Sequence, residues 1–353
     1  MIGDVTVLTI IRDRDGLRIR DLVNSLRHRG SEPNFLLIDY GSTESNSAAY
    51  RSICAELGIR YEKVRTEGWP WSRSHALNCG ARLVDTPYLA STDIDMVFDS
   101  DILEYCRENE APRRMQHAFA YWLPRDGNRN RASPAGKGSR GGFQFIRKSA
   151  FTEVGGYDEG IKYWGQEDLD WTTRLGALGY ELVWLPLQYR ALHQWHLNPE
   201  AGSQRPATAE FDTMNRCLSN SMSPILEQDW GRVVKDSDRP ILGLIKEGGF
   251  RELSVETNQL AKYGTLNNIA GALLEYGFIK INLGPRHVKR PLVSLAAPLS
   301  SILRPFTALT GLSLKRKVNT NFDFIYSSLP TLFSKGIRDY YISSDFSSIY
   351  LCH

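Results

Sequence analysis

Two aspartates stand two residues apart, directly after the short apolar run Tyr88-Leu89-Ala90. The run predicts a buried strand, and residues two apart on a strand point to the same face. Asp93 and Asp95 should therefore project together, with Ile94 turned into the core. Adjacent carboxylates repel each other unless a cation joins them, and Mg²⁺ or Mn²⁺ often links carboxylates to substrate phosphates. The pair indicates a metal–diphosphate site, and the alternative is a solvated acidic turn.

Two histidines, His193 and His196, stand three residues apart much later in the chain. Histidines at this spacing can share one metal ion in a turn or a helix. Imidazole together with carboxylate suits Mn²⁺, whose hardness is intermediate. No cysteine stands beside the pair, which excludes zinc-finger geometry. The histidines are candidate metal ligands, and the alternative for either one is a structural role.

A second acidic pair, Glu167 and Asp168, follows Trp164-Gly165-Gln166. It opens a predicted helix, because apolar residues recur at helical spacing up to the glycine cap at Gly179. The helix dipole favours ionised acids in the first turn, which alone explains one or two carboxylates. It does not explain the adjacent Trp-Gly. The functional interpretation is a general base beside Trp164, whose indole could stack on a sugar.

The elements that must position these residues alternate along the chain. Strands are expected at 5–11, 35–38, 59–64, 88–90, 143–146 and 180–186, and helices at 19–26, 49–57, 72–84 and from 167. This alternation predicts an α/β fold with an open, mostly parallel sheet and flanking helices. Such sheets bind ligands at the carboxyl ends of their strands. Five polar residues share that address: Arg12, Arg14, Asp39, Asp93 and Asp95. Taken singly, each fits a plain turn or loop, but together they favour a ligand site.

Composition narrows the class of protein. The 353 residues suggest about two domains, and a net charge of +3 is too small to indicate a nucleic-acid partner. The five cysteines are scattered without a C-x-x-C pair, which fits a reducing compartment. The first expected strand begins at Val5 and leaves no room for a signal peptide. We therefore expect a cytoplasmic protein.

With these motifs in order, residues 5–215 resemble nucleotide-sugar-dependent glycosyltransferases of the GT-A fold. The N-terminal part resembles glycosyltransferase family two. The later part resembles the C-terminal region of β-1,4-galactosyltransferases, also found in bacterial chondroitin-type polymerases. The resemblance implies a UDP-sugar donor, a glycan acceptor, a divalent cofactor (Mn²⁺ or Mg²⁺) and inversion in one step, in the synthesis of surface polysaccharide or another glycan.

The resemblance also implies a role for each candidate residue. On the donor side, the diphosphate would be met by Arg12, Arg14 and Arg73, the uracil or ribose by Asp39, and the ribose by Asp93. The metal would be held by Asp95 and His196, with His193 in the place of a second histidine ligand. The expected catalytic residues are Asp168 as the base and Glu167 beside it, with Glu167 and Trp164 against the acceptor. Tyr40 and Gln166 depart from the family patterns, which affects base or acceptor preference more than the reaction.

Three other functions stay open at this point. A retaining N-acetylgalactosaminyltransferase-like enzyme would share the Trp-Gly element and a late histidine, but such enzymes generally lack the Glu-Asp pair. A catalytically silent nucleotide-sugar-binding module would not need Asp168. A nucleotidyltransferase would carry a Gly-rich, Lys-containing loop after the first strand, and Arg12-Asp13-Arg14 is not that loop.

The C-terminal part carries no chemistry that we can assign. We expect a glycosyltransferase domain over 1–217 and a smaller α/β or α+β accessory region over 218–353. The apolar segment 289–317 has basic flanks but is too broken for a transmembrane helix. It is a candidate for peripheral contact with the inner face of a membrane, and a docked, buried segment is the favoured alternative.

Overall fold

The computed structural model describes residues 2–27, 32–135, 140–161, 166–196, 230–256, 263–284, 337–343 and 348–353. These residues form two compact units, one up to Asp238 and one from Arg239 to His353. The domain boundary expected at 217, the segment 289–317 and Trp164 all lie outside the described residues. Within the described ranges, no helix combines the length and apolarity needed to cross a membrane.

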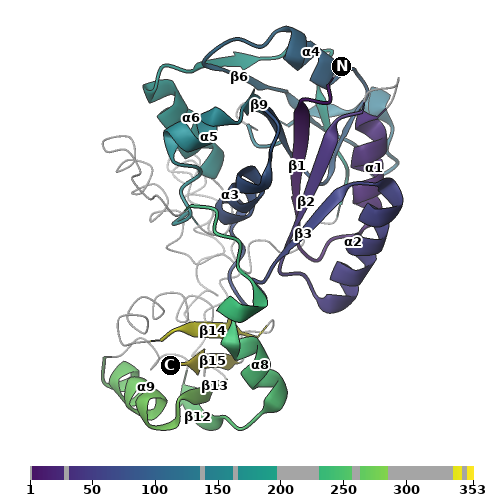
Figure 1. The fold of residues 1–353 in the computed structure, drawn as a ribbon. Coiled ribbons are helices and arrows are strands. Elements are labelled where there is room, and N and C mark those ends of the chain that lie inside the picture. Colours follow the sequence, from purple (N-terminus) through teal and green to yellow (C-terminus); the bar gives the residue numbers. More distant parts are fainter. Residues whose placement is uncertain are drawn as a thin grey trace, which may run out of the picture. The chain divides into compact units, whose positions relative to one another are not determined.

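A seven-stranded sheet forms the centre of the first unit (Figure 1). Its order is β10-β6-β9-β4-β1-β2-β3. The strands are β1 (Val5–Ile11), β2 (Asn34–Tyr40), β3 (Arg60–Val64), β4 (Tyr88–Asp93), β6 (Arg114–His117), β9 (Phe143–Arg147) and β10 (Glu181–Trp184). Only β9 runs antiparallel to its neighbours in this sheet. The predicted α/β fold with a mostly parallel sheet is confirmed.

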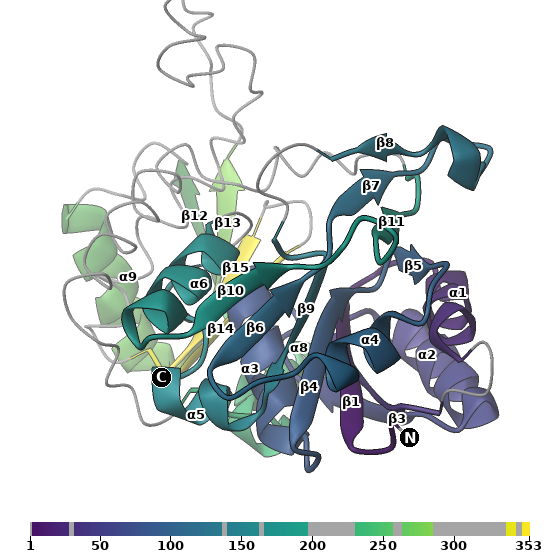
Figure 2. The same ribbon diagram turned by 90° about the horizontal axis from the view of Figure 1, so that it is seen from above.

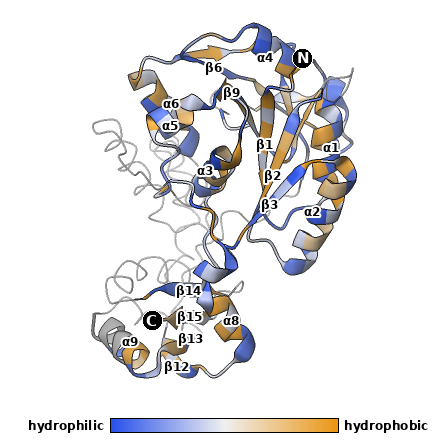
Figure 3. Cartoon of the chain, viewed as in Figure 1, coloured by the Kyte–Doolittle hydropathy of each residue, from blue (hydrophilic) through white to orange (hydrophobic). Residues whose placement is uncertain are grey.

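Helices cover both faces of this sheet (Figure 1). They are α1 (Leu17–Leu26), α2 (Glu44–Leu57) and α4 (Ile102–Glu108) on one face, and α3 (Arg73–Leu83), α5 (Ser149–Val154) and α6 (Glu167–Ala177) on the other. Neighbouring residues of a strand point to opposite faces. Val7 accordingly packs with Leu22 of α1, while Leu8 packs with Leu77 of α3. Figure 3 shows hydrophobic residues concentrated along the central strands between the two helix layers.

A second, four-stranded sheet of the first unit was not predicted from the sequence. Its order is β5-β11-β7-β8, with β5 (Met96–Phe98), β11 (Ala191–His193), β7 (Ala120–Trp122) and β8 (Ser133–Pro134). Each strand is only two or three residues long, so no alternating hydrophobic pattern can develop. This sheet joins the segment after the aspartates to the segment that carries the histidines.

The second unit has its own sheet, in the order β12-β13-β15-β14. Its elements are α8 (Pro240–Glu247), β12 (Arg251–Glu256), α9 (Tyr263–Tyr276), β13 (Phe278–Gly284), β14 (Asp339–Ile342) and β15 (Ser348–Cys352). The buried guanidinium of Arg239 donates from Nε to both carboxylate oxygens of Asp339, at 2.9 and 3.0 Å. This ion pair links the start of α8 to β14.

Candidate active site

Arg73 joins three distant segments of the first unit. It is the first residue of α3, whose N-cap Ser72 accepts a hydrogen bond from the His75 amide. The Arg73 guanidinium is buried. Nε and Nη2 donate to Asp93 Oδ1 at 3.1 and 3.0 Å, and Nη1 donates to Asp168 Oδ1 at 2.8 Å. Arg73 therefore fixes the end of β4 against the first turn of α6.

The carboxylates around Arg73 carry unusual proton affinities. Burial raises the pKa of Asp93 to about 6, although the Arg73 charge opposes the rise. Burial, with repulsion from Asp168, likewise raises the pKa of Glu167 to about 7. Glu167 Oε1 lies 3.7 Å from Arg73 Nη1. One guanidinium thus faces three carboxyl groups, an excess of acid that suits a site for a further cation.

Asp95 has different partners from Asp93, which corrects the expectation that both project together from one strand. The strand β4 ends at Asp93, and Asp95 lies in the turn before β5. The Asp95 oxygens Oδ1 and Oδ2 lie 3.5 Å from His193 Nε2 and 3.4 Å from His196 Nε2. The possible ligand atoms of these three residues all lie within 4.8 Å of one another.

The small sheet produces this cluster. Met96 of β5 pairs with His193 of β11, and the Gln194 amide donates to the Asp95 carbonyl at 2.8 Å. Pairing two short strands therefore brings together residues almost a hundred positions apart in the chain. The histidine pair and the second aspartate, predicted to share an ion, lie side by side in the fold.

The donor set fits a divalent metal ion. Asp95 Oδ1 and His193 Nδ1 are buried, and neither has a hydrogen-bond partner among the described residues. Burial alone would raise the pKa of Asp95, but His196 and His193 outweigh it and lower that pKa. Burial lowers the pKa of His193 and so favours the neutral imidazole that a metal requires. One carboxylate with two imidazoles suits an ion such as Mn²⁺.

Asp168 is the accessible member of the acidic pair. Its side chain is 21% exposed and that of Glu167 only 5%. Gln144 Nε2 of β9 lies 3.3 Å from Asp168 Oδ1. A Cβ atom on Gly141 would lie 2.3 Å from Asp168 Oδ2, so only glycine leaves this space open. Sequence reasoning missed both Gly141 and Gln144, because neither belongs to a charged motif.

The other predicted donor-side residues lie at the same edge of the sheet. Arg12 Nη1 donates to the Trp69 carbonyl at 2.9 Å, and the Arg14 amide donates to the Tyr50 hydroxyl at 2.9 Å. Asp39 is fully buried and accepts hydrogen bonds from the Ser42 amide, Ser47 Oγ and Tyr61 Oη. These bonds explain its position in the fold, and its contact with a nucleotide stays a prediction.

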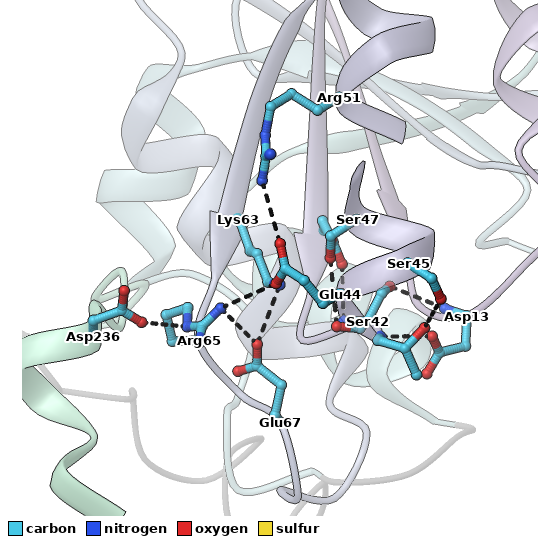
Figure 4. A network of polar contacts seen from close by, with 12 residues as sticks. Asp13, Ser42, Glu44, Ser45, Ser47, Arg51, Lys63, Arg65, Glu67 and Asp236 are labelled. Carbon is cyan, nitrogen blue, oxygen red and sulfur yellow. Dashed lines mark hydrogen bonds and ion pairs between the residues drawn. The ribbon is translucent and has the colours of Figure 1, made fainter. Parts of the chain in front are cut away.

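A polar network that the sequence did not predict surrounds the ends of β2 and β3 (Figure 4). Glu44 Oε2 accepts from Lys63 Nζ at 3.0 Å, and Glu67 Oε1 lies 2.9 Å from Arg65 Nη1. Arg65 also pairs with Asp236. These contacts fix the turn after β3 in the first unit.

Part of this chain is similar in sequence to a known protein family. Residues 130–196 match a family model described as the N-terminal domain of galactosyltransferase. The matched segment contains Glu167, Asp168, His193 and His196. This part of the chain is therefore similar to a galactosyltransferase domain. No curated protein sequence matches it significantly.

Two solved structures are similar to this chain at 15% sequence identity. One is GalNAc-T7 with UDP, GalNAc and Mn²⁺, with a TM-score of 0.47, covering 61% of this chain and 47% of that one. The other is the catalytic domain of Drosophila β1,4-galactosyltransferase 7 in complex with xylobiose, with a TM-score of 0.40, covering 60% of this chain and 79% of that one. This chain therefore spans about half the length of the GalNAc-T7 chain.

Proposed function

We propose that the first unit transfers a hexose or N-acetylhexosamine from a UDP-sugar to a hydroxyl of a glycan, with inversion and with a divalent metal ion. The observation that carries the proposal is the meeting of two clusters at one edge of the sheet. Asp95 with the two histidines forms a metal-type donor set. Asp93, two residues earlier, belongs to the Arg73 network that holds Asp168.

Asp95, His193 and His196 would hold the ion, Mn²⁺ or Mg²⁺. When bound, the ion supplies a Lewis acid for the diphosphate on which negative charge develops. The chain adds positive charge at the same edge through Arg12 and Arg14, which follow β1. Arginine suits this task, because its guanidinium meets phosphate oxygens in a bidentate manner.

Asp168 would act as the general base. Arg73 and Gln144 donate hydrogen bonds to its Oδ1. Its Oδ2 lies near Gly141, where the absence of a Cβ atom leaves room. The acceptor hydroxyl oxygen bonds to the anomeric carbon while the bond from that carbon to the diphosphate oxygen breaks. The hydroxyl proton passes to Asp168, and UDP leaves with the electron pair. Such a positioned base contributes about 10²–10⁴ in rate.

Inversion is favoured over retention by the exposure of the acidic pair. A single-step displacement needs one carboxylate that the acceptor can reach, and Asp168 is partly exposed whereas Glu167 is buried. Burial also raises the pKa of Glu167 to about 7, which makes it a poor anionic nucleophile near neutral pH. The anomeric configuration of the product, measured by NMR, distinguishes the two mechanisms.

We place the reaction in the cytoplasm, in the synthesis of a surface polysaccharide or another glycan. The cysteines support a reducing compartment, because the four in the described part of the chain are buried and free. In an oxidising compartment, at least some of them would be expected to pair.

A donor screen tests the proposed function. The purified full chain is incubated with Mn²⁺ and, separately, UDP-galactose, UDP-GalNAc, UDP-glucose and UDP-GlcNAc, and free UDP is measured. We expect one donor to release UDP, EDTA to stop the release, and Mn²⁺ to restore it. Full activity in EDTA would refute the metal site. Donor binding without any UDP release would instead identify a silent binding module.

A further inference from the structure

A partly exposed pair of aromatic rings lies beyond the residues assigned so far. Phe119 follows β6 by two residues, and Trp184 ends β10. Their rings stack with centroids 4.6 Å apart and planes inclined by 21°. The Phe119 side chain is 36% exposed, and Trp184 is half-buried. We call this pair the aromatic shelf.

Strand register places the shelf close to the proposed base. His117 of β6 pairs with Gln144 of β9 on one side and with Trp184 of β10 on the other. Gln144 in turn lies 3.3 Å from Asp168. Neighbouring strands are about 4.8 Å apart, so the Trp184 backbone stands about 10 Å from that of Gln144.

The shelf also lies on the face of the sheet that α6 covers. Met115, two residues before His117, packs in one cluster with Trp171 of α6, and Leu182, two residues before Trp184, packs against the same cluster. Residues two apart on a strand share a face, so His117 and Trp184 project toward α6. Figure 2 shows α6 beside β10 and β6. The first turn of α6 carries Asp168, so the base and the shelf face the same space.

The chemistry of the shelf suits a sugar ring. Aromatic side chains offer a flat apolar surface, and one face of a pyranose is lined by C–H groups. The span from Gln144 to Trp184 exceeds a single pyranose ring. A sugar on the shelf is therefore not the one that reacts at Asp168, but one further along the same glycan.

We propose that Phe119 and Trp184 form an acceptor subsite, which holds a sugar of the acceptor glycan beyond the one whose hydroxyl reacts. This inference rests on the proposed function, since it assigns Asp168 as the base. It narrows the substrate class, because a subsite at this distance favours an acceptor oligosaccharide over a monosaccharide. His117 lies opposite Trp184 on the neighbouring strand β6, and its ring is 5.4 Å from the indole.

The test compares glycan binding by the full chain and by two variants, with UDP and Mn²⁺ present. A glycan array is probed with the wild type, Trp184→Ala and Phe119→Ala. Each oligosaccharide bound is also compared with the methyl glycoside of its terminal sugar. We expect both variants to lose about tenfold in affinity for oligosaccharides, the size of one lost aromatic contact. Affinity for the monosaccharide glycoside should stay unchanged.

Two controls exclude a general defect. Trp184→Phe keeps a ring and should retain most of the affinity, and Tyr276→Ala removes an exposed aromatic residue of the second unit and should have no effect. UDP release in the absence of acceptor should be the same in all variants. The inference is overturned if no array glycan binds the wild type more tightly than the variants, or if the variants lose UDP binding as well. Failure of the wild type to hydrolyse any donor counts against the proposed function. The glycan affinities measured on the array still test the subsite in that case.

Discussion

At the residue scale, Arg73 determines where the carboxylate of Asp168, the proposed base, points. A buried guanidinium must be compensated, and Asp93 and Asp168 provide hydrogen-bonded negative charge at about 3 Å. Arg73 donates a hydrogen bond to Oδ1 of Asp168, and Oδ2 of the same carboxylate lies near Gly141. Arg73 thus contributes both to stability and to the orientation of Asp168, so a substitution of Arg73 would change both at once. Asp168 is therefore a more informative target for mutation than Arg73.

Asp168→Asn should strongly reduce transfer and spare donor binding. The amide oxygen can still accept from Arg73, but it cannot take a proton, so we expect the rate to fall by about 10²–10⁴. Initial rates of UDP release measure the loss, and calorimetric titration with UDP and Mn²⁺ measures binding. Glu181→Gln, at an exposed acid that begins β10, is the matched control. Turnover like that of the wild type in Asp168→Asn would refute the assignment of the base.

At the element scale, the entry to β9 shapes the site. Gly141 and Gly142 precede the strand, and each lies against a side chain of the site or of the small sheet. The backbone can approach these side chains closely only because both residues lack a Cβ atom. The two positions differ in what a methyl group would displace, which allows a paired test.

Gly141→Ala should reduce transfer, and Gly142→Ala should not. The new Cβ at 141 would lie 2.3 Å from Asp168 Oδ2 and so must displace the proposed base, to which Arg73 donates a hydrogen bond. A misplacement of about 1 Å can cost about 10² in rate. At 142 the nearest atom is Cε of Met96, at 2.7 Å, the end of a flexible side chain that can move. Steady-state rates and thermal unfolding of both variants check this, and equal rates in the two would contradict it.

His117 in β6 should make the fold sensitive to acid. Burial lowers its pKa from 6.5 to about 4, and the nearby charges of Asp168 and Arg140 act in opposite directions. Between these pH values the unfolded chain binds a proton that the folded chain does not, so stability falls as the pH falls. His117→Leu keeps a similar volume and removes the titration.

We therefore expect the wild type to lose about 2 kcal/mol more than His117→Leu between pH 7 and pH 4.5. Urea unfolding of both proteins at the two pH values gives the difference. Because other groups titrate equally in both proteins, the comparison isolates His117. If the free energies of unfolding of the two proteins changed equally with pH, His117 would bind its proton equally well in the folded and in the unfolded chain, and the prediction would be wrong.

At the scale of the whole molecule, the second unit has its own core and its own buried ion pair. The side chains of Arg239 and Asp339 are at most 2% exposed. Burying such a pair is costly, but removing one partner costs more, because the other charge is then left uncompensated. This pair therefore offers a way to weaken the second unit without touching the site in the first.

Asp339→Ala should destabilise the second unit by about 3–5 kcal/mol. In calorimetry, we expect the second unit to unfold at a lower temperature than in the wild type. The affinity of the first unit for UDP should be unchanged. Glu252→Ala is the control, since this exposed partner of Lys280 forms only a surface ion pair, which contributes little to stability. Equal effects of the two substitutions would contradict the role of the buried pair, and loss of UDP binding in Asp339→Ala would show that the first unit depends on the second.

The sequence by itself determined the local elements of the first unit. Apolar runs predicted β1, β2 and β4, and helical spacing placed the start of α6 at Glu167. These signals are local, because the period of the hydrophobic pattern follows from backbone geometry. The parallel sheet, and the polar residues at its carboxyl edge, followed from the alternation of these elements.

Only the tertiary structure decided which of those residues share a partner. The pairing of β5 with β11 places His193 beside Asp95, and the turn after β4 separates Asp95 from Asp93. The contact of Gly141 with Asp168 is equally invisible in the sequence. Short strands and a single glycine leave no periodic pattern, so their partners depend on long-range packing. The chemistry was therefore predictable by residue type, and its geometry only from the fold.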